Sequence, residues 1–277
     1  MLSIQHVMCG AMVMDPDAHE KGMGALVLPD AIRAYSGPRQ YSHFERSEDG
    51  KDVSWWAFPS DLKGLTRESV QESLKEGSHL AEGIRPCVLG EETDLGAFRE
   101  HNSHLPKEVY AGIEMHLRQD QVFDTFVREQ IDCTGRYEDT FVRNGQTMDG
   151  KEVRAMIGRM EQYGVYYLAH ELYEEKGIVA NQEWLEAYVK PALETAYPED
   201  LAEKTYSFMK VAEPYNTYIT QQDWSHLPEA PDGLSPDDFG KLYRQVFAET
   251  TLKSERPDLL GFAEGMDGLE DQEVIRL

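Results

Sequence analysis

A histidine and an aspartate interrupt the apolar face of a predicted helix near the middle of the chain. His116 and Asp120 are four residues apart, which is about one helical turn. They belong to a stripe with the spacing of a buried face, which reads Val109, Ile113, His116, Asp120, Phe123, Val127 and Ile131. A buried carboxylate without a partner is strongly unfavourable, so a cation or histidine must accompany Asp120. An imidazole and a carboxylate one turn apart are spaced to share a metal ion.

Further histidine and acidic residues occupy similar positions elsewhere in the chain. In the next long predicted helix, His170 and Glu174 are again four residues apart on an otherwise apolar stripe. His6 lies in the middle of an apolar N-terminal face with helical spacing. Asp30 directly follows a proline that is expected to break a helix, which would direct the carboxylate into a cleft. His43 lies between aromatic residues in a predicted loop.

Each of these residues also has an ordinary structural interpretation. A single inward-facing histidine is usually a hydrogen-bonded core residue, and a single His–Asp pair is often a structural ion pair. Several such residues in phase with apolar neighbours favour a metal site instead. The predicted ligands are His6, Asp30, His43, His116, Asp120 and His170, and the predicted general base is Glu174 or Asp124. Nitrogen and oxygen ligands of this kind suit Zn²⁺, Mn²⁺ or Fe²⁺ and do not select among them.

Apolar residues along most of the chain have the spacing of a helix face, so helices are expected to position these residues. Helices are expected over 66–83, 106–131, 150–176, 181–198, 200–212 and 236–252. The stretch 53–58 is the best strand candidate, and a short loop fits it equally well. We therefore predict an all-α fold, a helical bundle around a His/Asp metal site with minor irregular or short β segments. Residues 1–212 are expected to form the metal-binding domain, and residues 213–277 a proline-containing linker, a C-terminal helix and an acidic tail packed on it.

Charge and composition exclude several classes of partner. The chain of 277 residues carries 51 acids and 27 bases, a formal net charge of −24 that is spread along its length. Such a charge repels free nucleic acid and anionic membranes unless a local patch or a bound cation reverses the field. The three cysteines, Cys9, Cys87 and Cys133, are odd in number and far apart, which fits a reducing compartment. No signal-peptide pattern and no apolar run of about 20 residues occurs, so a cytoplasmic protein without a membrane span is predicted.

Three stretches resemble known metallohydrolases. GIEMHLRQDQVFD (112–124) resembles the His/Asp motif of acyl carrier protein phosphodiesterases, which are HD-domain-like all-α proteins, and YYLAHELY (166–173) is similar to their second, His-centred helix. His6 with GALVLPDA (24–31) and SHF (42–44) resembles the start of zinc-dependent phospholipase C-like proteins. Both resemblances imply a helical bundle that collects His and Asp around one or more metal ions for phosphoester hydrolysis.

These observations predict a metal-dependent hydrolase that uses metal-activated water on a small or carrier-bound phosphoester. Arg118 and Lys107 are nearby cations that could bind an anionic substrate. The alternative from a different class is a non-enzymatic acidic interaction protein, a nucleic-acid mimic or inhibitor of a basic partner with structural His/acid pairs. A redox-active iron protein is a third interpretation. Residues 178–277 carry no readable chemistry and could complete the bundle, cover the site or mediate a homodimer.

Overall fold

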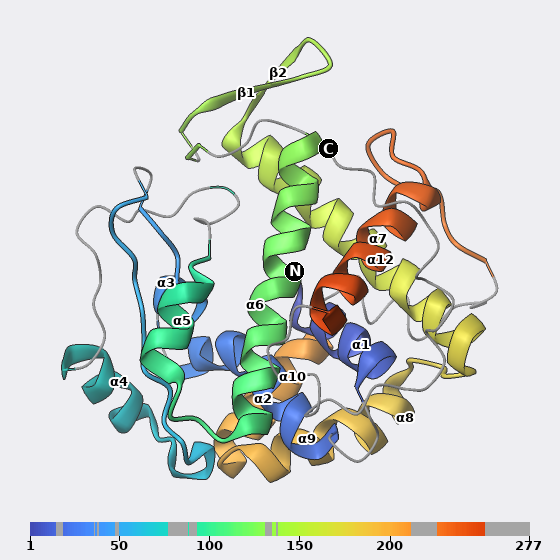
Figure 1. Ribbon diagram of the computed structural model, residues 1–277. Helices are drawn as coiled ribbons and strands as arrows, with labels where there is room; N and C mark the ends of the chain where they lie inside the picture. Colours follow the sequence, from blue (N-terminus) through green and yellow to red (C-terminus); the bar gives the residue numbers. More distant parts are fainter. Residues whose placement is uncertain are drawn as a thin grey trace.

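The computed structural model describes residues 1–14, 19–35, 37, 39–47, 50–76, 88, 93–130, 135–136, 138–211 and 226–252. The prediction of an all-α fold is confirmed, since helices account for most of this part of the chain (Figure 1). The β structure within it comprises one two-stranded hairpin and isolated bridges, such as Arg46 with Val53. The stretch 53–58 is therefore a loop with isolated bridges. No helix within the described ranges is long and apolar enough to cross a membrane.

The elements follow one another along the chain in this order. They are α1 (Ser3–Val13), α2 (His19–Ala31), η2 (Ile32–Tyr35), α3 (Arg39–His43), η3 (Leu62–Gly64), α4 (Arg67–Glu76), α5 (Leu95–Asn102), α6 (Lys107–Gln130), β1 (Thr140–Arg143), β2 (Gln146–Asp149), α7 (Gly150–Lys176), α8 (Gln182–Trp184), η4 (Leu185–Val189), α9 (Lys190–Ala196), α10 (Glu199–Val211) and α12 (Pro236–Leu252).

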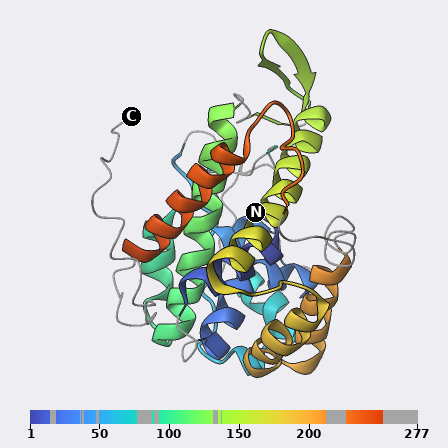
Figure 2. The ribbon, with the colours of Figure 1, turned by 90° about the vertical axis from the view of Figure 1, so that its right-hand side faces the viewer.

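Helix α6 runs through the middle of the molecule, and other elements pack around it (Figure 1). Helix α2 packs along α6 on one side and against α9 on the other, while α12 packs against α6, α7 and α1. Figure 2 shows α12 lying beside α6 and α7, with the α9–α10 region at the base of the molecule. The predicted inward stripe of α6 is buried at every position from Val109 to Val127, and Ile131 lies outside the described residues.

The first and last residues of the long helix α7 are set by a side-chain cap at one end and a left-handed glycine at the other. The side chain of Asp149 accepts hydrogen bonds from the backbone N–H groups of Lys151 and Glu152, and Glu152 accepts one from Asp149 N–H in return. This reciprocal cap satisfies donors that the first turn leaves free. Gly177 adopts a φ of 65° and ends the helix in the left-handed conformation. The predicted helix over 150–176 is confirmed.

The hairpin before α7 was not predicted, although its turn carries a recognisable signal. Asn144 and Gly145 both have positive φ angles, 51° and 76°, at the tip between the two strands. Asn-Gly is the usual sequence of such a two-residue turn. The strands it joins are only four residues long and mostly exposed, so they lack the apolar alternation that predicts a strand.

Two local predictions around the N-terminal helices were wrong. Pro29 was expected to end a helix before Asp30, but α2 continues through it to Ala31. The residues just before Pro29 are completely buried between α6 and α9, so tertiary packing outweighs the loss of one backbone hydrogen bond. His43 was expected in a loop and instead ends the short helix α3.

The predicted C-terminal helix is confirmed, and it packs on the helices of the N-terminal part. The amide of Gln5 donates a hydrogen bond of 2.7 Å to the hydroxyl of Tyr243, which joins α1 to α12. The linker predicted from residue 213 is described only from residue 226, and the acidic tail lies outside the described residues. The domain division at residue 212 stays a prediction.

Backbone contact between α2 and α6 gives a direct test of this arrangement. A Cβ at Gly112 would lie 2.6 Å from the carbonyl oxygen of Gly22 and 2.8 Å from the Cβ of Ala25. We expect Gly112→Ala to destabilise the fold by about 1–3 kcal/mol in thermal or urea unfolding. Gly158 in α7 is the matched control, because nothing lies within 4 Å of its added Cβ. Gly158→Ala should stabilise by about 0.5–1 kcal/mol through helix propensity, and equal effects of the two substitutions would contradict the close contact.

Candidate metal centre

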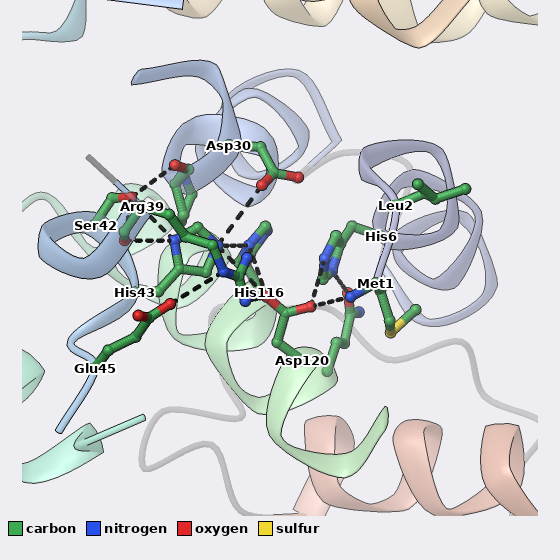
Figure 3. Close-up of polar contacts among 12 residues, drawn as sticks. Met1, Leu2, His6, Asp30, Arg39, Ser42, His43, Glu45, His116 and Asp120 are labelled. Atoms are coloured by element: carbon green, nitrogen blue, oxygen red, sulfur yellow. Dashed lines mark hydrogen bonds and ion pairs between the residues drawn. The ribbon is translucent and has the colours of Figure 1, made fainter. Parts of the chain in front are cut away.

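Histidine and aspartate side chains from α1, α2, α3 and α6 converge at one buried point (Figure 3). Two overlapping sets could each hold a metal ion: His6, His116 and Asp120, and Asp30, His43 and His116. The ligand atoms within each set lie within 4.8 Å of one another. The structure therefore brings together five of the predicted ligands, His6, Asp30, His43, His116 and Asp120.

The three imidazoles are held in the orientation that metal ligands require. Nδ1 of His116 lies 2.8 Å from the carbonyl oxygen of Leu26, and Nδ1 of His43 lies 3.1 Å from that of Arg39. Nδ1 of His6 lies 2.6 Å from Oε1 of Gln119. Because each of these oxygens can only accept a hydrogen bond, each Nδ1 carries the hydrogen that it donates and leaves the lone pair of Nε2 for the centre.

Contacts among the Nε2 atoms indicate that the donor set fits a cation. The Nε2 atoms of His43 and His116 face each other at 3.1 Å, and Nε2 of His6 has no hydrogen-bond partner within the described part of the chain. Burial lowers the pKa of His6 to about 4 and that of His43 well below its usual value, so neither imidazole is charged at neutral pH. The Nε2 atoms of His43 and His116 lie beside Oδ2 of Asp120, and nitrogen and carboxylate oxygen atoms at such spacing suit a cation.

Asp120 lies at the centre of the cluster and is almost completely buried (Figure 3). Its Oδ1 lies 2.5 Å from the amino group of Met1 and 3.2 Å from Nε2 of His6. Its Oδ2 lies 3.4 Å from Nε2 of His43 and 3.5 Å from that of His116. Burial acts to raise the pKa of Asp120, but the Met1 amino group, His6 and a nearby arginine outweigh it and hold the pKa well below the usual range. The carboxylate is therefore charged and able to bind a cation.

An arginine and a glutamate beside the cluster were missed by sequence reasoning. Nη2 of Arg39 lies 3.2 Å from Oδ2 of Asp120, and Nε of Arg39 lies 3.1 Å from the buried carboxylate of Glu45. The intervening Phe44 has a φ of 55°, and this left-handed turn brings Glu45 back towards Arg39. The available signal was the spacing of Arg39 and His43, four residues apart and therefore on one face of a helix.

The second predicted pair, on α7, does not join the cluster. His170 is half-buried and belongs to neither ligand set among the described residues, and Glu174 is exposed. The prediction that Glu174 faces inward is wrong, because the buried face of α7 continues through Leu168 and Leu172.

The remaining predicted groups lie on α6. Asp124 is half-buried one turn beyond Asp120, and burial, together with the charge of Asp120, raises its pKa to about 7 although the Met1 amino group opposes the shift. Arg118 is buried and pairs with Glu114 at 2.7 Å, and Lys107 is exposed. Arg118 is therefore engaged in a structural ion pair.

Comparison with known proteins gave no relative: no protein-family model matches the chain, and no match was found among curated proteins or solved structures. The geometry of the cluster and the residues around it are therefore the basis for a functional assignment.

Loss of a central imidazole should abolish metal binding. His116 belongs to both ligand sets, so His116→Gln is expected to weaken Zn²⁺ or Mn²⁺ binding by at least about 100-fold in equilibrium dialysis with elemental analysis. His170→Gln is the matched control and should bind the metal as the unaltered protein does. Equal metal binding by both variants would show that the cluster is a structural network.

The raised pKa of Asp124 predicts a pH dependence of stability in chelator-treated protein. An unfolded aspartate has a pKa of about 3.9, whereas folded Asp124 titrates at about 7. The folded state therefore keeps a proton that the unfolded state loses, and stability falls as the pH rises from about 4 to 7. Asp124→Asn should leave the melting temperature unchanged near pH 4 and raise it by a few degrees at pH 8. A variant that is less stable at pH 8 would contradict the assigned ionisation.

Proposed function

We propose that this protein is a metal-dependent hydrolase that acts on phosphoesters. The observation that carries the proposal is the arrangement of three imidazoles and two carboxylates in two ligand sets that share His116, with every Nδ1 engaged elsewhere. His43, His116, Asp30 and Asp120 would hold the ion, together with His6 beside Asp120. A divalent ion bound there would supply a nucleophilic hydroxide at neutral pH and a Lewis acid for phosphoryl oxygens.

Asp124 is the favoured general base among the residues predicted for that role. Its pKa of about 7 lets it accept a proton near neutral pH, which is where a general base works best. Glu174 is exposed on α7 and belongs to neither ligand set in the described part of the chain. We therefore assign proton abstraction to Asp124.

Arg39 would keep a positive charge at the edge of the centre during the reaction. Its guanidinium contacts Asp120 and Glu45, yet the side chain is 28% exposed and so reaches the edge of the cluster. A fixed cation at this position attracts the negative charge that a phosphoester brings to the metal. The diffuse acidic charge of the whole chain repels polyanions, which favours a small or carrier-bound phosphoester.

Hydrolysis of a phosphomonoester and a phosphodiester is the direct test. We expect the protein to hydrolyse p-nitrophenyl phosphate or bis-p-nitrophenyl phosphate after reconstitution with Zn²⁺, Mn²⁺ or Fe²⁺, to lose the activity on chelation and to regain it when the ion is restored. Asp124→Asn should lower kcat by about 10²–10⁴-fold, the usual contribution of a general base. Glu174→Gln should retain activity and serves as the control.

The possible failures of this experiment have different meanings. Tight metal binding without turnover of either ester would contradict the phosphoesterase proposal while leaving the metal centre intact. Absence of metal binding would contradict both and would favour the acidic interaction protein with structural His/acid pairs.

A further inference from the structure

A pocket adjoins the metal centre on the side of Asp30. It has a volume of about 290 Å³ and lies between the end of α2, the turn η2 and helix α10. Its wall includes Asp30, Arg33, Ala34, Lys204, Thr205 and Phe208. Asp30 belongs to both the pocket and the cluster, because its Oδ1 lies 3.6 Å from Nε2 of His43. The other four cluster residues are at most 1% exposed and do not line the pocket, so a molecule bound there would reach the cluster through Asp30.

The wall carries charges of both signs: the Asp30 carboxylate contacts Ser3 and His43, and Arg33 and Lys204 are the cations. Arg33 is exposed and makes no hydrogen bond or ion pair within the part of the chain that the structure describes. It lies three residues after Asp30, and both side chains line the pocket. Lys204 is partly neutralised, since its Nζ lies 3.3 Å from Asp200. Arg33 is therefore the cation available to a ligand, and guanidinium binds phosphate in a bidentate fashion.

Thr205 provides an independent sign of a missing partner. Its side chain lines the pocket and the residue is only 5% exposed, yet its hydroxyl makes no hydrogen bond with any described residue. A buried hydroxyl is rarely left without a partner. A polar atom of a ligand would satisfy this hydroxyl.

Apart from Ser3, whose hydroxyl donates a hydrogen bond to Asp30, the rest of the wall is apolar. Phe208 is 64% exposed, which is unusual for a large aromatic side chain, and Ala31 and Ala34 line the same pocket. The volume is at the lower end of the range for small-molecule sites. It suits a group of about the size of one ring and excludes a long chain or a polymer.

We propose that this pocket binds the organic group of a small phosphoester, a compact apolar or aromatic group that packs on Phe208, while the phosphate lies between Arg33 and the metal centre. The polar atom that joins the two parts would accept a hydrogen bond from Thr205. This inference rests on the proposed function for the identity of the anion. It narrows the substrate class from phosphoesters in general to small amphiphilic ones.

Binding of phenyl phosphate tests the pocket without requiring turnover. It can be measured by calorimetry or by NMR titration, with both the metal-reconstituted and the chelator-treated protein. We expect phenyl phosphate to bind about tenfold more tightly than inorganic phosphate, a difference that reflects the buried ring. Phe208→Ala should remove this preference and leave the affinity for inorganic phosphate unchanged. Arg33→Ala should weaken both ligands by about tenfold. Lys241→Ala, an exposed change on α12, is the control and should alter neither.

The substitution Thr205→Val tests whether the Thr205 hydroxyl contacts the ligand or stabilises the fold. Because the hydroxyl has no protein partner, its removal should leave the melting temperature unchanged or raise it, while phenyl phosphate binds about three- to tenfold more weakly. Equal affinity for phenyl phosphate and inorganic phosphate, or unchanged binding by Phe208→Ala and Thr205→Val, would overturn the pocket assignment. If binding follows these expectations but no ester is hydrolysed, the proposed function fails and the pocket assignment stands.

Discussion

The buried carboxylate of Asp120 is the group around which the rest of the structure is organised. A charge with only 1% of its side chain exposed is tolerated only where cations and polar groups surround it. The cations that do so are the Met1 amino group and Arg39, and the imidazoles of His6, His43 and His116 lie within 3.5 Å of the carboxylate oxygens. Met1 directly precedes α1 and the other groups come from α1, α3 and α6, so the N-terminal segments must fold onto the central helix. The His/Asp cluster and the helix packing are therefore a single structure.

The positions of a few residues on the apolar face of a predicted helix were enough to predict the core of this site. His116 and Asp120 share a face with residues that are all buried in α6, and a regular helix of that length keeps the phase. The same reasoning failed at the end of α7. The last turn of α7, from Tyr173 to Lys176, is exposed on every side. The helix therefore leaves the packed core before Glu174, and position on the stripe no longer predicts burial there.

The parts that could not be predicted depend on contacts between distant segments. The pairing of Arg39 with Glu45 requires the left-handed backbone of Phe44, an unfavourable conformation that local sequence would not suggest. It is held by burial of the ring, which packs against Phe98 with centroids 5.4 Å apart. The pocket likewise combines Arg33 with Phe208, which α10 brings beside η2. Neither arrangement has a periodic signal in the sequence.

The glycines of α2 and α6 have a consequence for the choice of ion. A Cβ at Gly24 would collide with Ala196 of α9, and one at Gly112 would collide with the backbone of α2. The backbone of α2 therefore packs closely against α6 on one side and α9 on the other. The same helix places Asp30 beside His43 and His116. Close backbone packing of this kind would leave the cluster little room to expand around a bound ion. We therefore expect any ion bound there to be a small one that accepts imidazole nitrogen rather than Ca²⁺, which needs six to eight oxygen ligands at longer distances.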